Sequence, residues 1–281
     1  MCRTEGDKSR CFRHGVPPRC HILGVREAVL PKPGPGGQAP NASLAAEGEA
    51  MKVAIMQPYF LPYVGYFQLI DAVDRFVVYD NIKYTKKGWF NRNRFLLNGS
   101  DAMFSIPLKR DSDSLDVRER EVSPDYDPEK LAGQLKGAYA RAPYFEHGFE
   151  LVRSVLPADE ANLFRFIRRS IDAVVDRLGI DTRIVVSSSV DADHSLKGQD
   201  RVLSICESLG ATTYVNAIGG VGLYSRDDFA ERGIDLRFIR SRPLEYRQFG
   251  APFVPWLSIV DLLMFNSAAD VKRMLAEYDL I

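Results

Sequence analysis

The sequence predicts an α/β fold: a three-layer, mostly parallel sheet with a β-hairpin insertion and an added helical segment. After Met51, a strand, a helix and a second strand follow within about thirty residues, the size of a βαβ unit, which requires a parallel strand pair. Strand and helix patterns alternate again after residue 181. Between these regions, Asn98-Gly99 joins two apolar runs and is a strong hairpin-turn signal.

Residues 1–50 differ in composition from the rest of the chain. They hold six of the 16 Pro and seven of the 21 Gly, and no helical or strand period persists in them. We therefore expect a disordered extension over 1–50, followed by one α/β domain over 51–281. The extension lacks the apolar core of a signal peptide. Met51 stands directly before the first apolar run, so it is a candidate start of translation.

The expected elements follow in order from Met51. Short apolar runs predict strands, and apolar residues at steps of three and four predict helices. The predicted strands are Val53–Met56, Phe76–Tyr79, Trp89–Leu97, Ala102–Leu108, an edge strand Val117–Val122, Thr182–Val186, Thr213–Val215 and Ile234–Ile239. The predicted helices are Gly65–Val73, Pro128–Tyr139, Tyr144–Leu156, Asp159–Leu178, Gly198–Leu209, Ser225–Glu231, Ser258–Phe265 and Ala269–Tyr278. For the clearest helix, Asp159 is the expected N-cap and Gly179 the expected C-terminal cap.

Charge and cysteine content exclude several classes of protein. The 37 Lys+Arg balance the 37 Asp+Glu, which argues against an overall electrostatic attraction to nucleic acid. No run of 18 apolar residues is present, so we expect no membrane span. The four Cys contain no CxxC pair and three of them precede residue 21, so we expect neither a zinc site nor a disulfide framework. Cys206 falls in a helical pattern and is expected in the core.

The loop after the first predicted strand is the first candidate for ligand binding. Ligands of open α/β sheets bind beyond the carboxyl ends of strands, and Gln57–Tyr66 has this place and leads into a helix N-terminus, which favours anions. Gly65 permits close approach, and Tyr63 and Tyr66 offer hydroxyls. A rigid, Pro-fixed corner is an equally good interpretation. Nucleotidyl transferases carry His-x-Gly-His where this chain has Tyr63-Val-Gly-Tyr66, which counts against their reaction here.

A basic strip follows the second predicted strand. Asp80 ends that strand, where a carboxylate could meet a ligand hydroxyl or ammonium, or could be a turn residue. From Lys83 to Arg94 the chain has five basic residues and no acid. Such a strip could hold a phosphate and stack a base or sugar on an aromatic ring, or could be a solvated hairpin. The candidate ligand-binding residues here are Lys86, Trp89, Asn91, Arg92 and Asn93.

Two further candidate segments follow later strands. Ser187 and Ser188 could cradle a phosphate with hydroxyls and backbone amides, or could be a strand-to-loop cluster. Gly219 and Gly220 permit close backbone approach, and Asn216 offers amide contacts. The Walker lysine and the dinucleotide glycine spacing are missing. Asp191, Asp193 and His194 could bind a metal, but three polar residues in a loop usually do not, so we expect no metal site. No motif identifies a cofactor.

A set of motifs extends over nearly all of residues 51–281. They are Gln57-Pro-Tyr-Phe-Leu-Pro-Tyr-Val-Gly-Tyr-Phe67, Asp80, Lys86, Asn91-Arg-Asn93, Ala142-Pro-Tyr-Phe145, Ser187-Ser188, Lys197-Gly198, Asp200-Arg201, Tyr214-Val-Asn216, Gly219-Gly220 and Leu257-Ser-Ile-Val-Asp-Leu-Leu263. With them the chain resembles the WbqC-like protein family, in which Trp is common at the position of Tyr63. The resemblance implies a bacterial protein of surface-polysaccharide (O-antigen) gene clusters that helps to decorate sugars with an acyl or amino-acid-like group. It fixes no catalytic residue.

Together these features predict a cytoplasmic transferase acting on a nucleotide-linked amino sugar or a similar phosphorylated small molecule, with no nucleic-acid partner. Lys86, Arg92 and the loop Ser187–Ser188 would hold phosphate. Asp80 would be a base or an amine anchor, and a raised pKa of a buried carboxyl would suit a base. The residues expected to orient the substrate are Gln57, Asn91, Asn93 and Asn216. The alternatives are a nucleotidyl or adenylate-forming enzyme and a non-catalytic sugar-nucleotide binding or scaffold protein.

Overall fold

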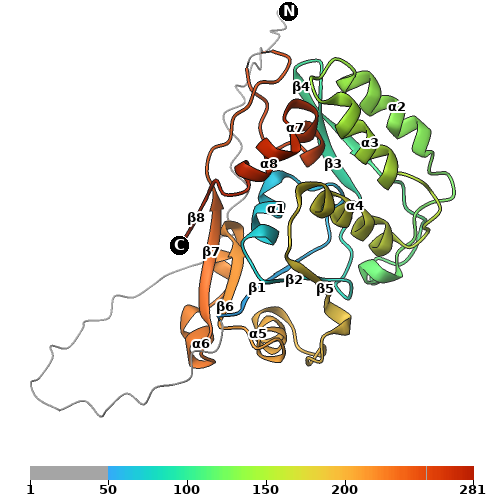
Figure 1. Cartoon of the computed structure of the whole chain (residues 1–281). Coiled ribbons are helices and arrows are strands. Elements are labelled where there is room, and N and C mark those ends of the chain that lie inside the picture. The colour runs from blue at the N-terminus through green and yellow to red at the C-terminus, as the bar shows by residue number, and fades with distance from the viewer. Residues whose placement is uncertain (1–49, 251) are drawn as a thin grey trace, which may run out of the picture. The chain divides into compact units, whose positions relative to one another are not determined.

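A computed structural model describes residues 50–250 and 252–281. The expectations for the N-terminal extension and for Cys2, Cys11 and Cys20 therefore lie outside the described residues. Within them, the order of strands and helices is that of an α/β protein with an inserted hairpin and an added group of helices (Figure 1).

The centre of the fold is a six-stranded sheet. Its order is β5 (Arg183–Val186), β2 (Arg75–Val78), β1 (Lys52–Met56), β6 (Thr213–Ala217), β7 (Asp235–Ser241) and β8 (Tyr278–Leu280). The first five strands are parallel, and β8 pairs antiparallel with β7. The predicted βαβ unit is confirmed, because β1 and β2 are parallel neighbours in register from Val53 opposite Arg75 to Met56 opposite Val78.

Helices cover both faces of this sheet, which confirms the predicted three layers. Alternate side chains of a strand point to opposite faces. Val53 and Ile55 belong to one buried cluster, and Ala54 between them belongs to the other. The helices of the first cluster are α5 (Gly198–Ser208) and α6 (Arg226–Glu231). Those of the second are α1 (Val64–Asp71), α4 (Leu163–Leu178) and α8 (Ala268–Met274).

The predicted hairpin and helical segment extend the second layer. β3 (Arg92–Leu97) and β4 (Ser100–Ser105) pair antiparallel. Their turn residues Asn98 and Gly99 have φ of 52° and 79°, the left-handed conformations that a tight hairpin turn requires. The added helices are α2 (Pro128–Tyr139), α3 (Phe145–Val155) and α7 (Ile259–Phe265).

The predicted edge strand Val117–Val122 is wrong. Val117–Glu119 form a 3-10 turn, because Asp116 and Glu119 make a capping box that satisfies the first backbone N–H groups. Only isolated bridges follow, one of which joins Val122 to Leu108.

Most helix ends lie within two residues of their predicted positions, and two of them differ by four. Helix α4 begins at Leu163 rather than at 159, because the side chain of Asn162 accepts the backbone N–H of Arg165 and caps the helix. Asp159 instead forms an ion pair with Arg169 at 2.6 Å. The predicted C-terminal cap is confirmed, since Gly179 is left-handed with φ of 59°. The last helix stops at Met274, and the chain continues into β8.

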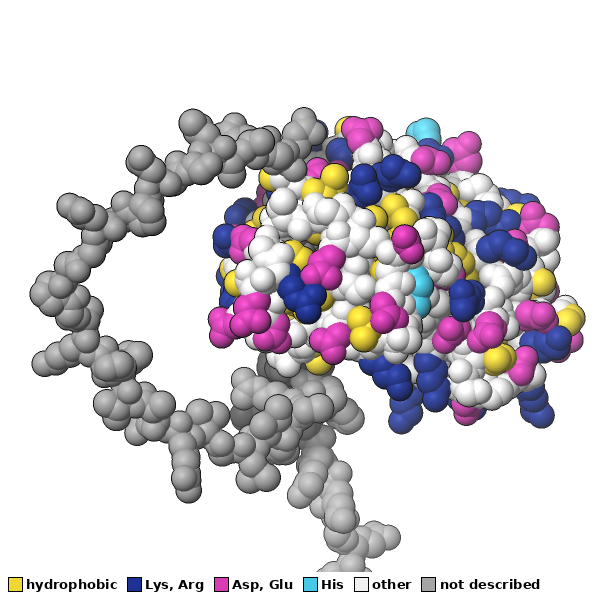
Figure 2. Space-filling model, turned by 90° about the horizontal axis from the view of Figure 1, so that it is seen from below, with side chains coloured by type: hydrophobic (Ala, Val, Ile, Leu, Met, Phe, Trp, Pro, Cys, Tyr) yellow, Lys and Arg dark blue, Asp and Glu magenta, His cyan; other side chains and the backbone are white. Residues whose placement is uncertain are grey.

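The surface carries mixed charge. Figure 2 shows acidic and basic side chains interspersed over one face, where neither sign forms a continuous stripe. Among residues 50–250 and 252–281, no helix combines the length and apolar character needed to cross a membrane. Within the same residues, no three His, Cys, Asp or Glu side chains are grouped closely enough to hold a metal ion. Cys206 is fully buried in the core, as predicted.

Candidate functional site at the carboxyl edge of the sheet

The order of the strands marks one point on the sheet edge. The chain runs from β1 outward to β2 and β5, and then crosses to the other side of β1 to form β6 and β7. The direction of winding therefore reverses between β1 and β6. Open α/β sheets bind ligands beyond the carboxyl ends of the strands at such a reversal.

Four predicted segments lie at this edge. Gln57 follows β1, Asp80 lies just beyond β2, Ser187–Ser188 follow β5, and Asn216 lies in the last part of β6. These four strands are consecutive in the sheet. Because neighbouring strands are about 4.8 Å apart, the segments span about 15 Å along the edge. The sheet thus brings together residues that are far apart in the sequence.

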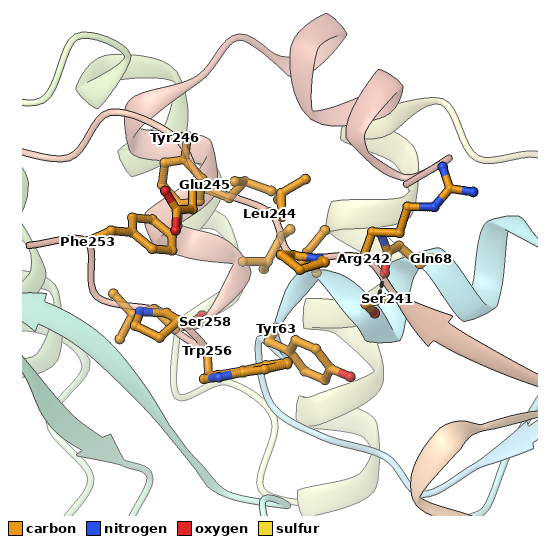
Figure 3. A pocket seen from close by; sticks show the side chains of 16 residues that line it. Tyr63, Gln68, Ser241, Arg242, Leu244, Glu245, Tyr246, Phe253, Trp256 and Ser258 are labelled. Atoms are coloured by element: carbon orange, nitrogen blue, oxygen red, sulfur yellow. Dashed lines mark hydrogen bonds between the residues drawn. The ribbon is translucent and has the colours of Figure 1, made fainter. Parts of the chain in front are cut away.

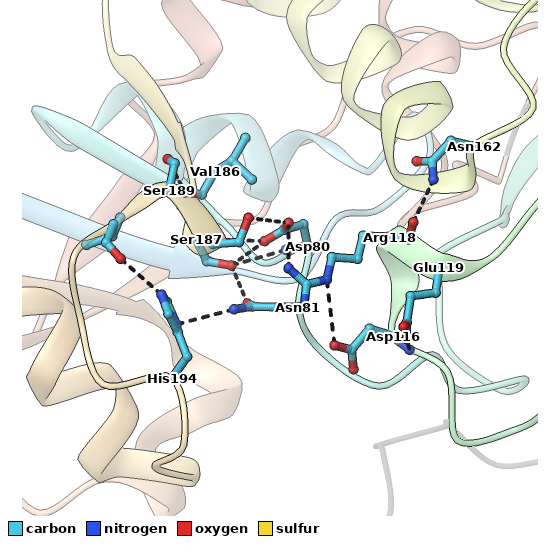
Figure 4. Close-up of polar contacts among 12 residues, drawn as sticks. Asp80, Asn81, Asp116, Arg118, Glu119, Asn162, Val186, Ser187, Ser189 and His194 are labelled. Carbon is cyan, nitrogen blue, oxygen red and sulfur yellow. Dashed lines mark hydrogen bonds and ion pairs between the residues drawn. The ribbon is translucent and has the colours of Figure 1, made fainter.

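Asp80 is buried, with 5% of its surface exposed, and has several hydrogen-bond donors around it (Figure 4). The backbone N–H of Ser188 donates to Oδ1 at 2.9 Å, and the Ser188 hydroxyl donates to Oδ2 at 2.6 Å. The Ser187 hydroxyl lies 2.8 Å from Asp80 Oδ1 and 2.6 Å from Asn81 Oδ1, so its single proton serves one of them at a time. The serine pair therefore contacts this carboxylate directly.

These contacts decide the protonation state of Asp80. Burial raises the pKa of the Asp80 carboxyl, but the hydrogen bonds from Ser188 and Ser187 lower it by more, so the pKa lies below its usual value. The expectation of a raised pKa is therefore wrong. At neutral pH the carboxylate is ionised and accepts hydrogen bonds, which suits an anchor for a hydroxyl or ammonium better than a general base.

Three side chains near Asp80 were not among the predicted site residues. They are Arg118, Arg201 and His194. The Arg118 guanidinium lies 3.9 Å from Asp80 Oδ2 and 3.9 Å from Asp116, with its side chain 47% exposed (Figure 4). Arg201 donates to the carbonyl of Asn81 at 3.1 Å and lies over the ring of Tyr79. Arg201 belongs to the motif Asp200-Arg201, on which the family resemblance partly rests. That motif was the signal from which Arg201 could have been selected. Arg118 lies in the segment that was predicted to be a strand.

His194 makes a contact through each of its ring nitrogens. Its Nε2 lies 3.0 Å from the carbonyl oxygen of Val190, so Nε2 must carry the proton. Its Nδ1 then accepts the Asn81 side-chain amide at 3.2 Å, with Arg201 at 3.5 Å. This contact fixes the loop after β5 against the end of β2.

The loop after β1 is held rigidly. Leu61 has φ of 43°, a strained conformation for a branched residue, and its carbonyl accepts Asn93 Nδ2 at 2.8 Å and the Ser258 hydroxyl at 2.7 Å. The Tyr66 hydroxyl donates to the carbonyl of Gln57 at 3.0 Å. Both hydrogens of the Asn93 amide go to loop carbonyls, so Asn93 positions the loop. The rigid-corner interpretation is therefore correct, and it does not exclude a ligand.

Gly65 is required by its neighbour Tyr63. A Cβ at position 65 would lie 2.4 Å from the Tyr63 hydroxyl oxygen and 2.5 Å from two ring carbons. The ring of Tyr63 therefore lies over the first turn of α1, where a larger residue at position 65 would displace it.

Lys86 and Arg92 of the basic strip make their contacts with other protein groups. Lys86 pairs with Asp113 at 2.9 Å on the surface, and Arg92 donates to the carbonyls of Lys87 and Gly88. Among the described residues, none of these contacts reaches Asp80. Two guanidinium groups, those of Arg92 and Arg94, lie 5.8 and 5.7 Å from the Trp89 ring. The Asn91 amide joins Tyr84 to the carbonyl of Ile106.

The segment after β6 bends back over Asn216. A Cβ at Gly220 would lie 2.3 Å from Asn216 Nδ2, whereas a Cβ at Gly219 would meet nothing. Asn216 Oδ1 accepts the backbone N–H of Ala217 at 2.8 Å. Gly220 therefore leaves room for the Asn216 amide, and the approach of a ligand to Gly219 and Gly220 stays a prediction.

A cavity of about 380 Å³ opens beyond the end of β7 and was not predicted. It lies between the start of α1, the chain after β7 and the loop before α7 (Figure 3). Tyr63 is the one predicted site residue in its wall. The rest of the wall comes from Val64 and Gln68 of α1 and from residues between 241 and 262. Between Ser241 and Ile259 the described residues form neither a helix nor a strand.

Comparison with known proteins gives the family. The WbqC-like protein family matches residues 57–273. The "Uncharacterized protein Rv1507c" of Mycobacterium tuberculosis strain H37Rv is 30% identical over 227 residues, which cover 80% of this chain and 97% of that protein. No solved structure matches. The range matched by the family contains each segment gathered at the sheet edge and the wall of the cavity, and it covers more than half of the chain, so the chain belongs to the WbqC-like protein family.

Proposed function

We propose that this protein is a cytoplasmic transferase that binds a nucleotide-linked sugar along the carboxyl edge of its sheet and modifies it with an acyl or amino-acid-like group. The observation that carries the proposal is the Asp80 carboxyl group at the end of β2, which accepts hydrogen bonds from Ser187 and Ser188 beside the reversal point between β1 and β6. The modification step is taken from the resemblance.

The strand order supports a nucleotide. The order β5-β2-β1-β6-β7 places the first strand centrally, with β2 and β5 on one side and β6 and β7 on the other. Dinucleotide-binding sheets share this order, and there an acidic residue near the end of the second strand accepts hydrogen bonds from ribose hydroxyls. Asp80 has the corresponding place and the corresponding charge state. This argument is an analogy of fold, which the binding experiment below tests.

The charges near Asp80 suit the phosphates of such a ligand. Arg118 is half-exposed, and its two ion-pair contacts are long at 3.9 Å, so its donors can reorient toward an anion. The N-terminus of α1 lies beyond the neighbouring strand β1 and favours negative charge. In this proposal Asp80 accepts hydrogen bonds from the ribose, and Arg118 binds the phosphate. Gln57 and Asn216 orient the rest of the ligand at the reversal point. Lys86 and Arg92 have no phosphate role in it.

Calorimetric titration of the full chain with a panel of uridine, thymidine and guanosine diphosphate sugars tests the proposal. Asp80→Asn should weaken binding of the active compound by about tenfold to a hundredfold, since hydrogen bonds to a charged group contribute about 1.5–3 kcal/mol. Asp113→Asn is the matched control, because Asp113 is a surface carboxylate paired with Lys86. It should bind like the wild type.

Two results would contradict the proposal. One is a wild-type protein that binds no sugar nucleotide, and the other is an Asp80→Asn variant that binds as tightly as the wild type while retaining its melting temperature. Release of pyrophosphate from ATP by the wild type would instead identify the adenylate-forming alternative. Binding without turnover in the presence of acyl and amino-acid donors would identify the non-catalytic alternative.

A further inference from the structure

We propose that the cavity beyond β7 binds an organic ammonium group. Four aromatic side chains form its walls together with one carboxylate at its rim. We call this set the aromatic cage, and it consists of Tyr63, Tyr246, Phe253, Trp256 and Glu245. The inference goes beyond the nucleotide site, because Asp80 does not line this cavity and the proposal does not depend on it.

The four rings form two pairs on opposite sides of the cavity (Figure 3). Tyr63 and Trp256 lie edge to face with ring centroids 5.8 Å apart, and Tyr246 and Phe253 lie edge to face at 5.1 Å. The faces of aromatic rings carry partial negative charge and attract a cation placed within about 6 Å of the ring centre. Aromatic cages of this composition bind ammonium ligands in other proteins.

The charges around the cavity favour a cation. Glu245 lies on the Tyr246 side of the cavity, and no ion pair within residues 50–250 and 252–281 includes it (Figure 3). Arg242 also lines the cavity, but its guanidinium is directed away from the rings. Two carboxylates neutralise that guanidinium, Asp279 at 2.7 Å and Glu277 at 3.5 Å. The remaining formal charge among the residues lining the cavity is therefore that of Glu245.

The loop that carries three of the rings is held in place by buried polar contacts. The Gln248 side chain accepts the backbone N–H of Val254 at 2.9 Å and donates to its carbonyl at 3.1 Å. The Tyr246 hydroxyl and the Gln248 amide both donate to Asp261, which is fully buried at the start of α7. These contacts fix the ring of Tyr246 before any ligand arrives, which lowers the entropy cost of binding.

The side chain of Trp256 is exposed to solvent, and its backbone is strained. It has φ of 61°, a conformation that bulky residues rarely adopt, and 62% of its surface is exposed. Arg94 donates to its carbonyl at 3.2 Å, and the next turn is fixed by Ser258, whose N–H donates to the carbonyl of Arg94 at 2.8 Å. Strained residues persist where the surrounding structure determines them, and they cluster at ligand sites.

The size of the cavity limits the ligand. A volume of about 380 Å³ lies at the lower end of the range for small-molecule pockets. A trimethylammonium or primary ammonium group on a short polar body fits that range. A neutral apolar group of the same shape would gain burial but not the attraction of the rings and of Glu245, and this difference can be measured.

Titration calorimetry with choline and with its uncharged carbon analogue 3,3-dimethylbutan-1-ol tests the proposal on the full chain. Choline should bind about tenfold or more tightly than the analogue. Glu245→Gln should weaken choline binding several-fold and leave the affinity for the analogue unchanged. Trp256→Leu should weaken choline binding by more than Glu245→Gln does. Glu231→Gln is the control, since Glu231 is an exposed carboxylate at the end of α6, outside the cavity.

Equal affinity for choline and its analogue would overturn the ammonium assignment and leave an apolar pocket. Absence of choline binding at tens of millimolar, or unchanged binding in Glu245→Gln, would overturn it as well. Melting temperatures of the unliganded variants separate loss of binding from loss of folding. Sugar-nucleotide binding by Glu245→Gln should equal that of the wild type, so failure here is distinguishable from failure of the nucleotide proposal.

Discussion

Ser188 donates two hydrogen bonds to Asp80, one from its backbone N–H to Oδ1 at 2.9 Å and one from its hydroxyl to Oδ2 at 2.6 Å. Each oxygen of the carboxylate therefore has a donor from the same residue. Since Ser188 follows β5 and Asp80 follows β2, the pair joins the carboxyl ends of two neighbouring strands. This contact links the charge of the candidate site to the stability of the fold.

Ser188→Ala should raise the pKa of the Asp80 carboxyl and destabilise the protein. The change removes one hydroxyl donor to a charged acceptor, a contact worth about 1.5–3 kcal/mol. Urea unfolding at neutral pH measures the decrease in the free energy of unfolding. Ser189→Ala is the matched control, because the exposed Ser189 hydroxyl donates to the carbonyl of Val186 rather than to Asp80. Equal effects of the two substitutions would contradict a special role for Ser188.

The wild-type protein should lose part of its stability in acid because of Asp80. The pKa of this carboxyl is lowered in the folded protein from an ordinary value of 3.8. The unfolded chain therefore binds the proton more tightly, so the stabilisation is fully present above the unfolded value and is lost as the pH falls through the folded value. Unfolding free energies measured between pH 2 and 6 should fall less steeply in Asp80→Asn. Parallel curves for the two proteins would show that Asp80 makes no such contribution.

Tyr246→Phe tests the hydrogen bond by which Asp261 holds one ring of the aromatic cage. Burial raises the pKa of the Asp261 carboxyl, and hydrogen bonds from Tyr246, Gln248 and Tyr139 lower it in part. Removing the Tyr246 hydroxyl should therefore raise that pKa further and cost about 1.5–3 kcal/mol where Asp261 is ionised. This loss of unfolding free energy should shrink as the pH falls through the raised pKa, because a hydrogen bond to a neutral carboxyl contributes less than one to a carboxylate.

The same measurement needs a tyrosine control. Tyr144→Phe serves, because the Tyr144 hydroxyl makes no hydrogen bond within residues 50–250 and 252–281, and Tyr144 lies outside the aromatic cage. Its unfolding free energy should match that of the wild type at every pH. A pH-independent loss in Tyr246→Phe would mean that the hydroxyl is not coupled to the charge of Asp261.

The elements of the fold could be predicted from the sequence because their signals are local. Val53–Met56 is a compact apolar run, and Asn98-Gly99 has the one turn chemistry that a tight hairpin favours. Asp116 and Glu119 form a capping box that can be read from the sequence, and it indicates a helical turn where an edge strand was predicted. Strand β8 has no period of its own and forms because its residues pair with the exposed edge of β7.

The candidate site was predictable only in part, for a different reason. Residues that end strands, such as Asp80 and Asn216, can be placed at the sheet edge from the order of elements alone. The pKa direction of Asp80 depends on Ser188, which joins it from a distant part of the sequence. Trp256 lies in an aperiodic loop, so its place in the cavity follows from tertiary contacts rather than from any pattern.

Gly65→Ala should destabilise the protein through Tyr63 and not through the helix. A Cβ at position 65 would lie 2.4–2.5 Å from the Tyr63 hydroxyl and ring, so the ring must move, at about 1–3 kcal/mol for overpacking. In a Tyr63→Ala background the same change should be neutral or stabilise by up to about 1 kcal/mol, since alanine favours a helix over glycine. A double-mutant cycle should therefore give a coupling well above the roughly 0.5 kcal/mol expected of independent sites.

Gly133→Ala in α2 controls for helix propensity in this cycle, because a Cβ there meets no atom within 4 Å. It should stabilise by about 0.5–1 kcal/mol in either background. Because Tyr63 also lines the aromatic cage, Gly65→Ala should weaken choline binding, whereas Gly133→Ala should not. A coupling energy near zero would show that the Tyr63 ring does not occupy the space above Gly65, and it would remove one wall from the proposed cage.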